Sequence, residues 1–383
     1  MVGKYIYYVD IDPEKPNGIQ KKILSQLKAF NKGDNYCELY CVESEKDSRF
    51  RFFLQHLPIV GKKYNKWIID QSFDSLDYLY IRRPSVFDGA FIKYLKQIKL
   101  INPKIKIIVE LPTYPYDSEY SGLIGDFTRW IDRRHRLKMY DYIDAFAIVA
   151  WNSTETTLWK IPVLPISNGI DLEAINKINR NELVQGSINL LYVAYFSPWH
   201  GYEKFIESLG YYYKSFEKNS KHSKQSIYLH MVGVGPELDN YKSIAKEANV
   251  DDKVIFYGEI NEGLDEIYEK CDIGVCSINS KKYGVTLSSQ LKSREYLAKG
   301  MPIITCGDID VLQSHDFPYE LIVDYDRRID FDRIIEFYNK RIRPDSRKAT
   351  EDIRAFAEKT CGWSATMRTV LEYLGIKGDE NNV

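Results

Sequence analysis

The sequence lacks the features that mark several large classes of protein. Its six cysteines, at positions 37, 41, 271, 276, 306 and 361, form no Cys-x-x-Cys pair and no group with histidine at zinc-binding spacing. Most of them lie in apolar, strand-like sequence, so we expect reduced thiols in the core. No run approaches the roughly 18 apolar residues of a membrane span, and no charged leader with a long apolar segment indicates a signal peptide. These absences predict a cytoplasmic protein, at most peripheral at the inner face of the cell membrane.

Net charge is nearly absent as well. The chain holds 53 Lys and Arg against 54 Asp and Glu, a formal charge of −1, which argues against a dedicated nucleic-acid binder. Residues 1–182 hold 27 basic against 23 acidic residues, and the remainder holds 26 against 31. The basic residues of the first half cluster at 93–106 (KYLKQIKLINPKIK) and 129–138 (RWIDRRHRLK). Each cluster is either a solvated helix face or a surface for an anionic membrane or an anionic acceptor.

Strand-like and helix-like segments alternate along the chain, whose 383 residues favour two domains. Apolar runs of strand length lie at 4–10, 77–83, 105–111, 144–150, 188–196, 226–233, 253–258, 272–278 and 301–307. Amphipathic segments of helical period lie at 19–30, 91–100, 127–142, 202–216, 237–248 and 264–271. The alternation predicts an α/β protein of two doubly wound, parallel-sheet (Rossmann-like) domains, joined within the polar segment 167–187.

The segment 290–304 (QLKSREYLAKGMPII) combines a helix, a stop signal and the start of a buried strand. Gly300 is the expected residue just past a helix end, and Pro302 prevents the helix from continuing. Glu295, near the start of this helix, is either a solvated surface residue or a group that holds the hydroxyls of a ligand. Ligands of open α/β sheets bind at the carboxyl ends of the strands, and that placement favours the ligand-binding interpretation.

Three further segments follow strands of the second half. AYFSPWHGYEKF (194–205) leads from a strand into a helix, whose first N–H groups can meet a phosphate. MVGVGPEL (231–238) has a Gly-x-Gly turn that lets a backbone approach a ligand, without the third glycine of the dinucleotide pattern. FYGEINEGL (256–264) places a turn that can shape a nucleobase slot. Each segment is weakly specific alone, and His200 and Lys204 are as easily surface residues.

In this order and spacing, the four segments strongly resemble the nucleotide-sugar half of the GT-B glycosyltransferases, specifically the large retaining family 4. The resemblance runs from Ile188 to Gly307, and REYLAKGMPII (294–304) is similar to that family's E-A-M-A-x-G-x-P-V-I signature. Weaker similarity extends through PNGIQKK (16–22), YIRRPS (80–85), ELPTYPYD (110–117) and ISNGID (166–171). These variants look most like transferases of bacterial capsule or surface-polysaccharide assembly.

The resemblance implies the GT-B fold, in which two such domains face a central cleft. It implies an acceptor-side domain at 1–182 and a nucleotide-sugar-binding domain at 183–355. A C-terminal helical segment at 356–383 is then expected to cross back to the first domain, and its last residues, from about Asp379, are expected to be disordered.

The resemblance also implies roles for individual residues. Glu295 matches the glutamate that binds the ribose hydroxyls of the donor, and a carboxylate can accept two charge-assisted hydrogen bonds from such a diol. Electrostatic stabilisation of the departing diphosphate is the expected main catalytic effect. The catalytic candidates are Glu110, His200, Lys204 and Lys292. The donor-binding candidates are Gly18, Trp199, Gly201, Gly233, Gly235, Gly258, Glu259, Ser289, Leu291 and Glu295.

Three positions depart from the family pattern. Leu287 stands where a second glutamate is common, Gln290 replaces a glycine, and His200 stands where a lysine usually precedes the glycine of the phosphate loop. The dependable positive charge at the diphosphate is then left to Lys204 or Lys292.

Acceptor contacts are expected in ELPTYPYD, which follows the carboxyl end of a strand. Thr113, Tyr114 and Asp117 could bind acceptor hydroxyls there, and a purely structural Pro/Tyr loop is the alternative. Gly18 marks either a close approach of the backbone to donor or acceptor, or an ordinary turn.

The sequence therefore predicts a retaining, metal-independent glycosyltransferase without a cofactor. It would move a sugar from a nucleoside-diphosphate sugar to a saccharide acceptor, which we expect to be lipid-linked. Asp-x-Asp occurs at 10–12, 308–310, 324–326 and 330–332, a pattern that chance supplies readily and whose positions suit a diphosphate–metal bridge poorly. Two alternatives remain: a nucleotide-sugar epimerase of the same fold, and a non-catalytic partner subunit of another glycosyltransferase.

Overall fold

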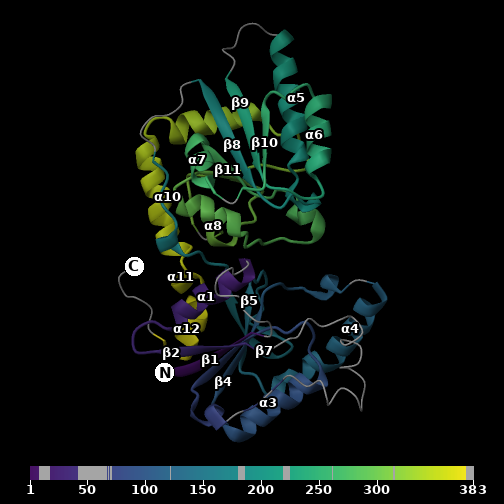
Figure 1. Cartoon of the computed structure of the whole chain (residues 1–383), viewed down its shortest axis with the longest axis vertical. Helices are drawn as coiled ribbons and strands as arrows, with labels where there is room; N and C mark the ends of the chain where they lie inside the picture. Colours follow the sequence, from purple (N-terminus) through teal and green to yellow (C-terminus); the bar gives the residue numbers. More distant parts are fainter. Residues whose placement is uncertain are drawn as a thin grey trace. The chain divides into compact units, whose positions relative to one another are not determined.

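The structure is a computed structural model (Figure 1) that describes residues 1–7, 18–41, 67, 69, 71–120, 122–179, 186–218, 225–260, 262–313 and 315–376. The chain forms two compact units, Met1–Asn168 with Trp363–Val383, and Gly169–Gly362. The sequence-based boundaries at 182/183 and 355/356 differ from these. Ile170 already packs on the core of the second unit, and its N–H donates to the Cys361 carbonyl over 2.9 Å. The predicted disordered tail and residues 8–10 of the first predicted strand lie outside the described residues.

The first unit is built on a seven-stranded sheet of order β2-β1-β3-β4-β5-β7-β6, parallel except for the β6–β7 pair. Its strands are β1 Val2–Tyr7, β2 Tyr36–Cys41, β3 Tyr78–Arg82, β4 Lys106–Leu111, β5 Ala145–Val149, β6 Thr157–Leu158 and β7 Ile161–Ile166. Its helices are α1 Gly18–Phe30, α3 Gly89–Ile101, α4 Gly122–His135, the 3-10 helix η4 Arg136–Asp141, α11 Trp363–Thr366 and α12 Arg368–Leu374.

Alternating strand residues give this sheet two apolar faces. Ile6 and Leu79 pack in one buried cluster with residues of α3. Their chain neighbours Tyr5 and Tyr78 pack in another cluster, with α1 and the C-terminal helices α11 and α12. The last helices of the chain are therefore part of the core of the first unit.

The second unit is built on a six-stranded parallel sheet of order β10-β9-β8-β11-β12-β13. Its strands are β8 Ser187–Val193, β9 Ser226–Val232, β10 Val254–Gly258, β11 Ile273–Val275, β12 Ile303–Thr305 and β13 Glu320–Ile322. Its helices are η6 Pro198–His200, α5 Glu203–Lys218, α6 Leu238–Glu247, α7 Leu264–Lys270, η7 Ser280–Tyr283, α8 Leu291–Ala298, α9 Phe331–Phe337 and α10 Ser346–Thr360. The strand order reverses between β8 and β11, which makes their carboxyl ends a topological switch point.

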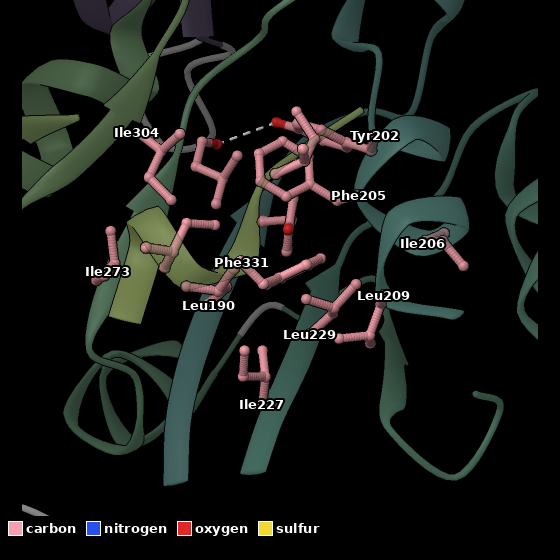
Figure 2. Close-up of a cluster of buried hydrophobic side chains, with 14 of the residues drawn as sticks. Leu190, Tyr202, Phe205, Ile206, Leu209, Ile227, Leu229, Ile273, Ile304 and Phe331 are labelled. Atoms are coloured by element: carbon pink, nitrogen blue, oxygen red, sulfur yellow. Dashed lines mark hydrogen bonds between the residues drawn. The ribbon is translucent and has the colours of Figure 1, made fainter. Parts of the chain in front are cut away.

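Both faces of the second sheet are covered. Leu190 and Ile273 pack with α5, α6 and α9, and Figure 2 shows Leu190 and Ile273 with Phe205 of α5 in this cluster. On the other face Leu191 packs with α7, α8 and α10. At the edge of the first cluster the Tyr202 hydroxyl donates to the Val275 carbonyl over 3.3 Å, which ties the start of α5 to the end of β11.

Strand and helix positions follow the sequence pattern closely, with a few omissions. The strands β2, β6, β7 and β13, the helix α9 and the first part of α10 were not predicted. β7 contains Pro162 and Pro165, which weaken its strand signal. None of the six cysteines, all of which lie in the described ranges, forms a disulfide bond, and five of them are buried, as expected. Among the described residues, no helix is long and apolar enough to cross a membrane.

Candidate functional site

The candidate site of the second unit lies where the loops after β8 and β11 meet the start of α8. The Ile278 N–H donates to the His200 carbonyl over 2.9 Å, and the Asn279 amide donates to the Pro198 carbonyl over 3.2 Å. These bonds join the two loops at the topological switch point. The sequence motifs that follow β8 and precede α8 are thus brought together at the edge where ligands of such sheets bind.

Gln290, the residue in place of the family's glycine, fixes the start of α8. Its side-chain oxygen accepts from the Ser277 N–H over 2.9 Å, and its amide nitrogen donates to the Ser277 carbonyl over 3.4 Å. This two-way contact holds the first turn of α8 against the chain that leaves β11. The first N–H groups of a helix are donors without partners inside the helix, so their position is set by this side chain.

Arg294 is a buried anchor of the same helix. Its guanidinium forms an ion pair with Asp310 and donates to the Ser289 hydroxyl over 3.1 Å. Arg294 is fully buried, so its charge requires this compensation. Asp310, one end of an Asp-x-Asp pattern, is therefore used inside the protein, and the pair holds residues 289 and 310 together at the base of the site.

Lys292 supplies a cation between the two loops. Its amine donates to the Tyr202 hydroxyl over 2.9 Å and to the Ser277 hydroxyl over 3.4 Å. Burial lowers the pKa of Lys292 to about 7, and the nearby Cys276 acts in the opposite direction. A group with this pKa gains a proton readily when an anion approaches.

His200 is buried at the end of η6 and is neutral at pH 7. Its Nδ1 accepts from the Ser197 N–H over 3.0 Å, so the ring proton of the neutral form is on Nε2. Burial, followed by the neighbouring Lys292, lowers the pKa of His200 to about 3. The ring stacks on Tyr202 with centroids 5.1 Å apart. His200 can thus offer an N–H to an anion but no charge.

Lys204 is placed differently from Lys292. Its amine lies 3.8 Å from the Glu207 carboxylate and 5.5 Å from the centroid of the Tyr325 ring. It sits in the first turn of α5 with its side chain partly exposed. Of the two lysines that the sequence offered as the cation, Lys292 is the one in direct contact with both loops of the switch point.

The glycines of the predicted donor loops are required by the fold itself. A Cβ on Gly233 would lie 1.8 Å from the Ala194 carbonyl oxygen, and one on Gly235 would lie 2.4 Å from that of Phe196. The loops after β8 and β9 therefore approach each other too closely for any side chain. We expected these glycines to admit a ligand, and the structure gives them a packing role. Gly201 is also crowded, whereas a Cβ on Gly258 would enter open space.

Glu295 lies near the middle of α8, mostly buried, and forms no ion pair among the described residues. Burial raises the pKa of its carboxyl, while the Tyr268 hydroxyl and Lys299 act in the opposite direction. Arg294, its sequence neighbour, is paired elsewhere. Of the remaining donor-binding candidates, Leu291, Trp199 and Glu259 are exposed to solvent. Ser289 is partly buried, and its hydroxyl accepts a hydrogen bond from Arg294.

In the first unit, Glu110 is the centre of a closed network. Lys22 and Arg82 donate to one carboxylate oxygen over 3.1 and 2.6 Å, and Gln26 and Tyr80 donate to the other over 2.9 and 2.8 Å. Burial acts to raise the pKa of Glu110, but Lys22 and Arg82 with these hydrogen bonds outweigh it and hold the pKa at about 2. These four contacts keep the carboxylate ionised and give Glu110 a structural role in the first unit, and its catalytic role stays a prediction.

In the loop predicted to bind the acceptor, some side chains already have partners within the protein. Asp117 accepts from Arg133 over 2.6 Å and from Arg136 over 2.8 Å, so its carboxylate is already paired with residues of α4 and η4. Thr113 is exposed, and Tyr114 is partly buried against the ring of Trp151, 5.5 Å away between centroids. Gly18 is the first residue of α1.

Sequence reasoning missed the residues that organise the second unit's site. Tyr202, Ser277 and Gln290 position Lys292 and the start of α8 through contacts between distant segments. The departure of Gln290 from the family's glycine was the one signal that could have drawn attention to this position.

A comparison with known protein families matches part of the chain. Residues 174–309, which lie within the second unit, match the sequence model of the family described as glycosyl transferases group 1. No curated protein matches the chain by sequence.

Among solved structures, HepE from Anabaena in complex with UDP aligns with a TM-score of 0.59 at 13% identity, covering 98% of this chain and 100% of that one. A glycosyltransferase from Rickettsia africae aligns with a TM-score of 0.58 at 12% identity, covering 97% of each chain. The lipopolysaccharide outer core galactosyltransferase WaaB aligns with a TM-score of 0.56 at 11% identity, covering 97% of this chain and 100% of that one. The chain therefore has the GT-B fold, and its second unit carries the sequence pattern of group 1 glycosyl transferases.

Proposed function

We propose that the protein is a retaining glycosyltransferase of family 4. It transfers a sugar from a nucleoside-diphosphate sugar to a hydroxyl of a lipid-linked saccharide, without a metal, at the cytoplasmic face of a bacterial membrane during surface-polysaccharide synthesis. The observation that carries the proposal is the contact of Lys292, in the first turn of α8, with both loops of the switch point, within the segment that matches the family model. Support also comes from structures of the same fold, one of them solved with UDP.

Each element of the site has a distinct role in this proposal. The first N–H groups of α8 and the amine of Lys292 bind the diphosphate and stabilise the charge that develops on it as the sugar departs. Glu295, one turn further along α8, accepts hydrogen bonds from the ribose hydroxyls. His200 adds a neutral N–H donor, and Gln290 positions the helix start by holding Ser277.

Lys292 gives donor binding a characteristic pH dependence. With a pKa of about 7 in the empty protein, its amine is mostly charged at pH 6 and mostly neutral at pH 8.5. Since a diphosphate favours the charged form, we expect nucleoside-diphosphate affinity to fall above pH 7 by up to about tenfold per pH unit, with uptake of a proton on binding. Calorimetry in buffers of different ionisation enthalpy measures both effects.

The variant Lys292→Met is expected to lower affinity at pH 7 by about tenfold or more, the equivalent of one charge-assisted hydrogen bond, and to abolish the proton uptake. Lys246→Met, at an exposed position of α6, serves as the control and should leave both unchanged. Proton uptake that persists in Lys292→Met would assign the titration to another group.

The proposed function is tested by incubating the full chain with a panel of nucleotide sugars, with and without lipid-linked saccharide acceptors. We expect a glycosylated acceptor and a free nucleoside diphosphate, with the configuration at the anomeric carbon retained. Conversion of the donor sugar without an acceptor would instead indicate an epimerase. Donor binding without turnover, together with stable association with another transferase, would indicate a non-catalytic subunit.

The acceptor side of the proposal rests on charge. The basic clusters at 93–106 and 129–138 belong to the first unit, and a lipid-diphosphate acceptor is anionic and held at a membrane surface. We therefore include peripheral contact with an anionic membrane in the proposed function.

A further inference from the structure

Helix α4 presents a row of large apolar side chains to solvent. Leu123, Trp130 and Leu137 follow one another at intervals of seven residues, so they lie on one side of the helix and its continuation η4. They are 90%, 56% and 58% exposed. We call these three residues, with the neighbouring exposed Ile124, the α4 stripe. Figure 1 shows α4 at the margin of the first unit, on the side away from α1 and α12.

The opposite side of α4 is packed in the core of the first unit, so the helix cannot rotate to bury the stripe. Gly125, Thr128, Ile131 and Asp132 are buried. Asp132 accepts from the Phe87 N–H over 3.1 Å and from the Tyr116 hydroxyl over 3.0 Å. A rotation of α4 that hid the stripe would break these bonds and expose Ile131.

The stripe is flanked by positive charge. α4 and η4, residues 122–141, contain five Arg and Lys against three Asp. Arg133 and Arg136 both form ion pairs with Asp117, and Arg129 forms an ion pair with Asp126. Arg134 lies over the Trp130 ring, 5.6 Å from its centroid, and Lys138 is exposed.

Apolar residues in a row, tryptophan among them, with basic residues alongside, are the features of a helix that lies in the plane of a lipid–water interface. A protein partner that matched this surface would need an apolar groove lined with acidic residues. A bilayer with anionic headgroups supplies both properties without specific pairing, because acyl chains accept the stripe and headgroups neutralise the arginines.

We propose that α4 and η4 form a membrane-docking surface, with the α4 stripe inserted at the acyl boundary of an anionic bilayer and Arg134 and Lys138 against its headgroups. The proposal deepens the membrane contact of the proposed function and rests on it for the location of the acceptor. It differs from attraction through basic clusters alone, because apolar insertion survives salt that screens surface charge.

The test uses the full chain and vesicles of phosphatidylglycerol and phosphatidylcholine, compared with phosphatidylcholine alone, in a co-sedimentation assay. Leu123→Ser with Trp130→Ser is expected to weaken binding to the anionic vesicles at least about tenfold, because two large side chains no longer leave water. The matched control is Leu100→Ser with Ile101→Ser, which removes side chains that are 71% and 46% exposed at the end of α3, beside the other basic cluster. It should change binding less than about twofold.

Two further measurements separate the contribution of apolar insertion to vesicle binding from that of electrostatic attraction. Raising the salt concentration should weaken wild-type binding and leave a residual fraction, and the serine variant should lose that fraction. Arg134→Gln with Lys138→Gln should lose the preference for anionic over neutral vesicles. The proposal is overturned if the serine variant binds as tightly as wild type, if the α3 control loses binding instead, or if the wild type ignores all vesicles. It is also overturned if the stripe proves to join two copies in sedimentation velocity.

Nucleoside-diphosphate affinity is measured on the same variants. It should be unchanged throughout, because α4 belongs to the first unit and the donor site to the second. A variant that loses vesicle binding but keeps nucleotide binding is defective in the docking surface alone. A wild-type protein that fails to bind nucleotide contradicts the proposed function and leaves the docking surface untouched.

Discussion

Replacing Glu110 with Gln is expected to destabilise the first unit by about 3–5 kcal/mol, the usual effect of removing one partner from a buried ion pair. The variant removes the counter-charge that Glu110 provides to the buried Lys22 and Arg82. Its new amide group also meets the donors of Gln26 and Tyr80, which formerly bonded a carboxylate oxygen. Volume and shape are nearly unchanged, so the loss reports the electrostatic network.

The measurement is urea unfolding followed by tryptophan fluorescence. Five of the six tryptophans belong to the first unit, and Trp199 alone belongs to the second, so the signal reports mainly the unit under test. Glu38→Gln is the matched control, because Glu38 pairs with Lys4 over 3.7 Å with half its side chain exposed. Exposed pairs contribute about 0–1 kcal/mol, and an equally small effect at Glu110 would contradict the network.

The stability contributed by Glu110 has a defined pH window. The pKa of Glu110 is about 2 in the folded protein, against an ordinary value of 4.5. A lowered pKa stabilises the folded state above the unfolded value, and the contribution is lost as the pH falls through the folded value. The difference in unfolding free energy between wild type and Glu110→Gln should therefore be constant above about pH 5 and shrink between about pH 4.5 and 2.

Glu295→Gln is expected to act on the donor and to leave the fold intact. If Glu295 binds the ribose diol in both the ground state and the transition state, the variant raises the donor KM and lowers kcat less. Loss of one charge-assisted bond of about 1.5–3 kcal/mol corresponds to about 10- to 150-fold in kcat/KM. Steady-state kinetics with varied donor measure this, and Glu247→Gln on the exposed face of α6 is the control.

Thermal stability distinguishes the two interpretations of Glu295. Arg294, the neighbour with which it could have paired, is bound to Asp310 instead. Burial raises the pKa of Glu295, so its charged form is disfavoured in the empty protein, and a neutral amide should leave the melting temperature unchanged or slightly higher. A stable Gln variant with unchanged donor kinetics would falsify the ribose role.

Most strands and helices of the second unit could be predicted, with β13 and α9 as exceptions, because their signals are local. β8, β9 and β10 are continuous apolar runs, and α8 ends at a Gly–x–Pro stop that the sequence states directly. The family motifs are local too, which is why His200, Lys292 and Glu295 were named. β7 was missed because its two prolines weaken the strand pattern, although the pairing of Pro162 with Thr157 on the edge strand β6 tolerates one of them.

What could not be predicted is how each polar side chain is paired. Lys22 and Glu110 are 88 residues apart in the sequence, and their contact depends on the pairing of β4 with β3 in the sheet. Asp117 is taken by arginines from the following helix, and nothing in ELPTYPYD indicates this. The sequence correctly indicated that positions 233 and 235 need a residue without a side chain. The reason we gave, close approach of a ligand, differs from the one in the structure, where the backbone of a neighbouring loop fills the space.

The place of the last helices has a consequence for biosynthesis. The second unit is one continuous stretch, Gly169–Gly362, whereas the first needs both its N-terminal part and Trp363–Val383. Met367, Leu371 and Leu374 cover a face of the first sheet that would otherwise be open to water. The residues that complete the first unit are therefore synthesised only after the whole of the second unit. Residues 1–168 cannot complete their core until the residues after Gly362 have been made, so premature termination before residue 363 leaves an apolar sheet face exposed to aggregation.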